Sequence, residues 1–196
     1  MGDSNRGAPW APMLLRSAVA AAFGILTVFW QAPGPAVLGV AGGLYLLLTG
    51  LALWRMAALA GRTGLAQART LQLASAGVHV LAGIAVLALQ TVEVFCVAAG
   101  AAFLIGGAVD LFLWTKVRSA FLPARDWLIT GVAGVGTAVL LVAVQAMALG
   151  AQAMLGITGG SAIIIAVVLA ISGLGARWDA RPGRGVRPAA ASPENP

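Results

Sequence analysis

The sequence predicts an all-α fold, a polytopic bundle of six transmembrane helices. Its 196 residues are 60% hydrophobic and 9% charged, whereas soluble globular domains are about 45–50% apolar and about 25% charged. The apolar residues form six runs, each close to the ~20 residues that one helical crossing needs. The cations stand at or near the ends of these runs, which is typical of membrane proteins. We therefore expect a lipid bilayer to surround most of the chain.

The elements follow from the breaks between the runs. Residues 1–12 are polar and predict a flexible N-terminus, and the turn at residues 31–35 holds two prolines and a glycine that no helix continues through. A central hairpin turns near residues 90–93, and residues 178–196 predict a disordered basic tail because they are rich in Arg and Pro. The membrane domain then covers residues 13–177. Its expected crossings are 13–30, 36–54, the two arms of the central hairpin at 75–113, 127–144 and 153–174.

The distribution of charge predicts the orientation. All 12 Lys and Arg residues lie in the N-terminal region, the second and fourth connections, the C-terminal tail, or at adjoining helix ends. With six crossings these regions share one side, which the positive-inside rule makes cytoplasmic. We expect a multi-pass protein of the inner or plasma membrane with both termini in the cytoplasm. The tail arginines would contact anionic lipid headgroups there, and we expect no nucleic-acid partner.

An internal repeat predicts that the six helices form three tandem two-helix hairpins, at about residues 13–58, 70–117 and 126–176. Glycines and a glutamine recur at similar spacing in the first two, as Gly24, Gln31, Gly43, Gly50 and as Gly83, Gln90, Gly100, Gly107. The third hairpin keeps Gln145 but shifts its glycines. Because every copy starts on the same side, these are parallel repeats and not inverted ones.

Three segments carry a resemblance to a known family. They are LLRSAVAAAFGILTVFWQAP at residues 14–33, RDWLITGVAGVGTAVLL at 125–141 and GITGGSAIIIAVVLAISGLGAR at 156–177. They resemble the HdeD family of short-repeat bacterial membrane proteins. The resemblance implies a six-helix inner-membrane protein linked to acid resistance, with no established catalytic activity.

His79 and Asp110 are the candidate pH-sensing pair. They lie at similar depths on neighbouring antiparallel helices of the central hairpin. An ionised Asp is costly inside a membrane and favours a partner, and a His–carboxylate pair titrates where it is able to sense or relay protons. The alternative is that Asp110 reaches toward Lys116 or Arg118, while His79 donates to a backbone carbonyl.

Other polar residues and glycines are weaker candidates. Glu93, with glutamines at the outer helix ends, predicts either solvated or capping groups or an external polar site; these glutamines are Gln31, Gln90 and Gln145. Small residues spaced four apart let two helices approach closely, either within the bundle or between copies in a homo-oligomer. The predicted helix-packing glycines are Gly39, Gly43, Gly106, Gly107, Gly156 and Gly160.

The sequence favours a protein that is not an enzyme. It has one Cys and one His, and it lacks nucleotide-binding, hydrolase and metalloprotease motifs, so we expect no metal and no cofactor. Our first hypothesis is an HdeD-like protein of acid or envelope stress. The alternatives are a small oligomeric channel or transporter for protons or small solutes, and an assembly partner that binds other membrane proteins through its glycine faces.

Overall fold

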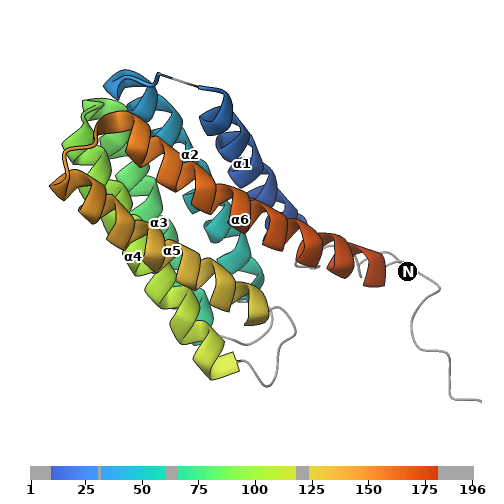
Figure 1. The fold of residues 1–196 in the computed structure, drawn as a ribbon. Helices are drawn as coiled ribbons and strands as arrows, with labels where there is room; N and C mark the ends of the chain where they lie inside the picture. The colour runs from blue at the N-terminus through green and yellow to red at the C-terminus, as the bar shows by residue number, and fades with distance from the viewer. Residues whose placement is uncertain (1–9, 31, 61–65, 118–123, 181–196) are drawn as a thin grey trace, which may run out of the picture.

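The computed structural model describes residues 10–30, 32–60, 66–117 and 124–180. Within these ranges the chain forms helices and no strand (Figure 1). The helices are α1 (Trp10–Phe29), α2 (Pro35–Ala60), α3 (Ala66–Leu89), α4 (Val92–Val117), α5 (Ala124–Ala146) and α6 (Gly150–Asp179). All six are long and apolar enough to cross a membrane. The prediction of an all-α bundle with six candidate transmembrane helices is confirmed.

Several helices are longer than predicted at the end where the arginines gather. α2 continues past Trp54 to Ala60, α3 begins at Ala66 and not at Ser75, and α6 reaches Asp179. Between Gly50 and Gly61 the sequence has no Gly or Pro, and its Ala, Leu, Met and Arg residues are good helix formers. Hydropathy predicts where the apolar run ends. The helix itself continues for as long as the residues favour helical backbone, which is why it extends beyond the apolar run.

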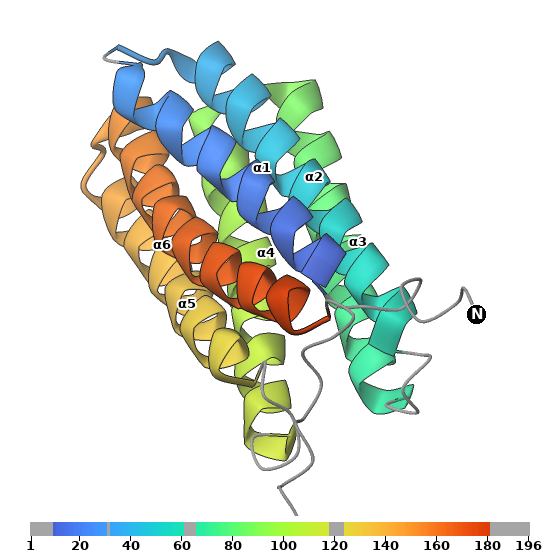
Figure 2. The same cartoon turned by 90° about the vertical axis from the view of Figure 1, so that its right-hand side faces the viewer.

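The six helices close into a ring in which the first and last helices are neighbours. The closest-packed pairs are α2 with α3, α4 with α5, and α1 with α6, while the two helices within each predicted hairpin pack less closely. Figure 2 shows α1 beside α6, although helices α2 to α5 separate the two in sequence. The ring therefore holds its tightest contacts between hairpins and not inside them.

Glycines make these three close contacts possible. A Cβ added to Gly83 on α3 would lie 2.8 Å from the carbonyl oxygen of Gly43 on α2. The same construction on Gly107 of α4 ends 2.8 Å from the carbonyl oxygen of Gly131 on α5. On Gly24 of α1 it ends 3.3 Å from the carbonyl oxygen of Gly159 on α6. Since apolar side chains gain nothing from leaving water inside lipid, such backbone contact is a main source of helix association.

The predicted helix-packing glycines divide into two groups. Four lie against a neighbouring element: Gly39, Gly43, Gly106 and Gly107. A Cβ on Gly156 or Gly160 would meet nothing within 4 Å, so the prediction that these two pack inside the bundle is wrong. Gly156 and Gly160 are spaced four apart and share the outward face of α6. Gly159 lies on the inward face and provides the contact with α1.

The interior has an apolar half and a polar half. The largest fully buried apolar side chains lie toward the hairpin turns: Leu38, Leu46, Val86, Phe95, Leu141, Met154 and Leu155. Buried polar side chains gather mainly toward the arginine-rich end: Ser17, Thr49, Gln72, Ser75, His79, Asp110, Asp126 and Thr130. The two other buried threonines, Thr137 and Thr158, each donate to a carbonyl of their own helix.

Replacing Ser17 with Ala is expected to lower the free energy of unfolding by about 0.6 kcal/mol, and by at most ~1.7 kcal/mol. The reason is that Ser17 Oγ donates to the Ala166 carbonyl oxygen at 2.7 Å and joins α1 to α6 in a buried site. Unfolding in rising concentrations of sodium dodecyl sulfate measures the change. Thr70→Ala is the matched control, since Thr70 donates to Ala66 of its own helix in an exposed place; an equal loss in both variants would contradict the prediction.

Candidate intramembrane polar site

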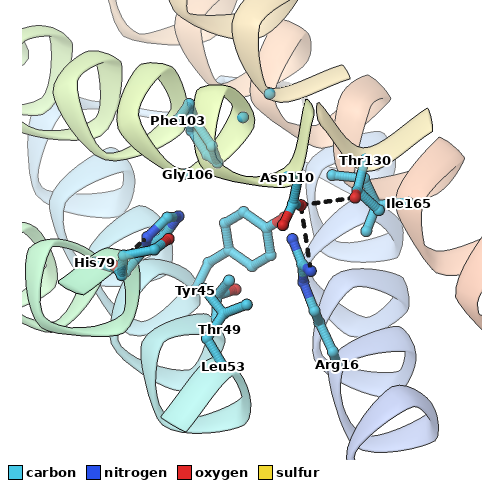
Figure 3. Close-up of a pocket in the computed structure, with 13 residues that line it drawn as sticks. Arg16, Tyr45, Thr49, Leu53, His79, Phe103, Gly106, Asp110, Thr130 and Ile165 are labelled. Carbon is cyan, nitrogen blue, oxygen red and sulfur yellow. Dashed lines mark hydrogen bonds and ion pairs between the residues drawn. The ribbon is translucent and has the colours of Figure 1, made fainter. Parts of the chain in front are cut away.

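Asp110 is the centre of the buried polar residues. Its side chain lies on α4 with 5% of the residue exposed. Asp110 Oδ2 accepts a hydrogen bond from Thr130 Oγ1 of α5 at 2.7 Å and lies 3.8 Å from Arg16 Nη1 of α1. Figure 3 shows the three side chains converging from their helices. One carboxylate therefore connects α1, α4 and α5, which come from the three predicted hairpins.

Arg16 is the counter-ion of Asp110, and it is not among the residues predicted for this site. Its side chain is 11% exposed, and its Nε has no hydrogen-bond partner among the described residues. A charged group of either sign inside a membrane is costly, and pairing of the two lowers that cost. The expected alternative, Asp110 paired with Lys116, is wrong: the Lys116 ammonium lies 5.5 Å from the centre of the Phe112 ring. Arg118, the other candidate, lies outside the described residues.

His79 lies on α3 with 3% of the residue exposed. Its Nδ1 is 2.9 Å from the Ser75 carbonyl oxygen, and because a carbonyl only accepts, Nδ1 carries the proton. In the neutral ring this leaves Nε2 as an acceptor. The His79 ring also meets the ring of Phe103 edge-on, with centroids 6.1 Å apart.

His79 and Asp110 line the same cavity but are not bonded to each other. Figure 3 shows the ring of Tyr45 between them, with its hydroxyl directed toward Asp110. The ring of Phe23 stacks on the ring of Tyr45, with 4.3 Å between the two centroids, and supports Tyr45 in this position. The structure thus brings the two predicted residues together around one space, with a phenol inserted between the imidazole and the carboxylate.

The cavity has a volume of about 20 Å³. This exceeds the ~10–15 Å³ that a single water needs, and its walls carry polar groups, so it suits a small hydrogen-bonding guest. Thr49 Oγ1, on a residue that is 3% exposed, has no hydrogen-bond partner among the described residues. The polar lining residues are Arg16, Tyr45, Thr49, Ser75, His79 and Asp110, joined by Thr130.

The residues of the expected external polar site lie elsewhere. Glu93 is exposed in the first turn of α4, and Gln145 is exposed in the last turn of α5. Gln90 follows α3 with a positive φ of 49°, and its Nε2 donates to the Leu87 carbonyl oxygen at 3.2 Å. Gln31 lies outside the described residues. The apolar half of the interior separates these positions from Asp110.

Sequence reasoning missed Arg16, Thr130 and Tyr45. Arg16 was interpreted only as a cation near a helix end. The signal that finds it with Thr130 is the glutamine spacing: Arg16, Ser75 and Thr130 each stand 15 residues before Gln31, Gln90 and Gln145, respectively. All three line the cavity. Tyr45 has no comparable signal, because one aromatic residue in an apolar run is typical of a packed helix.

A second carboxylate lies one helical turn from Thr130. Asp126 on α5 is 7% exposed, and its Oδ1 accepts from Ser172 Oγ of α6 at 2.6 Å. Its Oδ2 has no partner among the described residues. Residues four apart share a helix face, so Asp126 and Thr130 form a polar edge of α5 that runs toward the arginine-rich end.

The chain matches no protein-family model, no curated protein and no solved structure. The resemblance to the HdeD family stays a prediction that rests on the quoted segments.

Proposed function

We propose that this chain is a non-enzymatic, HdeD-like integral membrane protein of the bacterial inner membrane that responds to acid or envelope stress. One observation carries the proposal, the buried Arg16–Asp110 ion pair between α1 and α4. With the hydrogen bond from Thr130 on α5, this pair links all three predicted hairpins through a single ionisable oxygen.

The chemistry of the pair gives the direction of the acid response. While Asp110 is ionised, it compensates the charge of Arg16 and accepts from Thr130. When the pH falls and the carboxylate takes up a proton, Arg16 loses its counter-ion in a buried site. Protonation of Asp110 therefore removes the attraction between its carboxylate and Arg16, which loosens the contacts among α1, α4 and α5. A carboxyl that is protonated in the folded protein while it is still ionised in the unfolded chain binds more protons when folded, so acid favours the folded state over the unfolded one.

The polar half of the interior suggests the side from which protons arrive. Asp126 and Gln72 are buried between Asp110 and the arginine-rich end of the bundle. The opposite half of the interior is filled by apolar side chains such as Phe95, Leu141 and Met154. We propose that the arginine-rich end faces the cytoplasm, with both termini inside and the basic tail against anionic lipid. The protein would then sense acid that has entered the cell.

The three tandem hairpins belong to the same proposal. Support comes from the consistent order of packing, tight between hairpins and looser within them, and from glycine contacts at each of the three tight pairs. Three equivalent copies around one axis would place Arg16, Ser75 and Thr130 at matching positions. The polar site would then be the place where one repeated position has diverged into a cation, a hydroxyl and a second hydroxyl.

Acid is expected to raise the thermal midpoint of the wild-type protein in detergent between pH 8 and pH 4, because Asp110 takes up its proton more readily in the folded protein than in the unfolded chain. Asp110→Asn is expected to lose most of this pH dependence. Glu93→Gln is the matched control, because Glu93 is an exposed carboxylate at the other end of α4. In the native host, Asp110→Asn should also fail to restore acid survival to a strain that lacks the protein. A pH dependence that persists unchanged in Asp110→Asn contradicts the proposal.

A proton channel or transporter is the second candidate, favoured by the polar cavity and by His79, whose Nε2 is an acceptor in the neutral ring. The filled apolar half of the interior would have to open for this activity. Proton flux into liposomes separates the two candidates, because only a channel or transporter dissipates a pH gradient.

An assembly partner is the third candidate. Gly156 and Gly160 face outward on α6 with open space above them, which leaves room for the close approach of another helix. Capture in mild detergent, compared between the wild type and Gly160→Leu, tests this candidate.

A further inference from the structure

The cavity beside Arg16 holds more hydrogen-bond donors than the described residues use. Arg16 Nε and Thr49 Oγ1 are both buried, and neither atom has a hydrogen-bond partner in the part of the chain that the structure describes. Both residues line the cavity of about 20 Å³, together with Tyr45 and Ser75. Guanidinium and hydroxyl groups that line one small space are suited to an anion, because each donates hydrogen bonds and the guanidinium also supplies charge.

The charge state of Asp110 determines whether the cavity favours an anion. The titratable groups around it are Arg16 from α1, Tyr45 from α2, His79 from α3 and Asp126 on α5, while α6 contributes the apolar Ile165. With Asp110 ionised, it neutralises Arg16, and an anion entering the cavity would meet a carboxylate. With Asp110 protonated, Arg16 is a buried cation without a counter-ion, which is a costly arrangement.

We propose that the cavity binds a small monovalent anion of the halide class, chloride above all, when Asp110 is protonated. The anion replaces the carboxylate as counter-ion to Arg16 and accepts from Thr49. The cavity volume of about 20 Å³ limits the guest to one small ion. This proposal rests on the proposed function, since the protonation of Asp110 is the event that both invoke.

The charges at the nearest helix ends favour the same ligand. Arg55, Arg69, Lys116, Arg125 and Arg177 all lie near the helix ends closest to the cluster. These cations outnumber Asp179, the exposed acid that ends α6 on the same side, so they raise the local concentration of anions. Acid and anion would thus bind together, each raising the affinity of the protein for the other by the same factor.

The test compares thermal unfolding in sodium chloride and in sodium gluconate of equal ionic strength, because gluconate is too large for the cavity. At about four times its dissociation constant, chloride should raise the midpoint of the wild type at pH 4.5 by ~2–4 °C. It should not raise the midpoint at pH 8. In Asp110→Asn, which mimics the protonated acid, chloride should stabilise at both pH values.

Removal of the cation is the second arm. In the double variant Arg16→Gln with Asp110→Asn, neither partner of the ion pair remains beside the cavity and the chloride effect should disappear at every pH. A wild type that is insensitive to chloride at pH 4.5 overturns the anion site. This comparison uses the wild-type protein alone and does not depend on whether any variant folds.

The failure of this inference differs from the failure of the proposed function. An acid response in gluconate that depends on Asp110, without any effect of chloride, overturns the anion site alone. The loss of the acid response itself overturns both.

Discussion

Replacing Arg16 with Leu is expected to lower the free energy of unfolding by about 3–5 kcal/mol, the usual cost of removing one partner of a buried ion pair. The variant leaves Asp110 buried without its cation, while the hydrogen bond from the Thr130 hydroxyl remains. The carboxylate must then stay charged and uncompensated or take up a proton. Unfolding in sodium dodecyl sulfate at pH 8 measures the loss, and lowering the pH should recover part of it.

The double variant Arg16→Leu with Asp110→Leu should be more stable than either single variant. Two apolar side chains replace a pair whose desolvation offsets much of its attraction, so such exchanges are often neutral. Arg55→Leu is the control for loss of a cation alone, because Arg55 is exposed on α2. Additive losses in the double variant would mean that Arg16 and Asp110 do not interact.

Replacing Gly83 with Ala is expected to cost about 1–3 kcal/mol, the range for overpacking a well-packed interior. The added Cβ would lie 2.7 Å from the Leu47 nitrogen and 2.8 Å from the Gly43 carbonyl oxygen. Both are backbone atoms, so no side chain can turn aside, and α2 must move away from α3. Unfolding in sodium dodecyl sulfate again provides the measurement.

The control for Gly83 stands on the same helix. A Cβ on Gly77 would meet nothing within 4 Å, so Gly77→Ala should bring no loss and benefits from the higher helix propensity of Ala. Equal effects of the two substitutions would contradict the close approach of α2 and α3. The comparison separates helix propensity from packing, because both variants change the same residue type.

Composition and hydropathy were sufficient to predict the six helices, because lipid imposes a simple length and polarity rule on each crossing. The helix ends were less predictable. Residues such as Arg55 and Arg69 interrupt the apolar pattern but not the helical backbone, so α2 and α3 extend beyond it. The closure of α1 against α6 follows from packing at Gly24, Gly159 and Ser17, and local sequence carries no signal for so distant a contact.

The candidate site was predicted in part. Asp110 and His79 stood out because ionisable residues are rare within apolar runs. Their mutual pairing did not follow, since which partner a buried carboxylate finds depends on the order of helices around the ring. Arg16 was misjudged because its distance from the chain start is typical of an interfacial cation, whereas helix α1 begins at Trp10 and carries Arg16 two turns inward.

The protonation of Asp110 is measured most directly by infrared difference spectroscopy between pH 8 and pH 4.5 on the protein in lipid. The account predicts a carboxylic acid C=O band in the wild type that appears over the same pH range as the rise of the thermal midpoint. This band should be absent from Asp110→Asn and present in Glu93→Gln. If Asp110→Asn gives the same difference spectrum as the wild type, the ion pair is not the group that responds to acid, and the account is wrong.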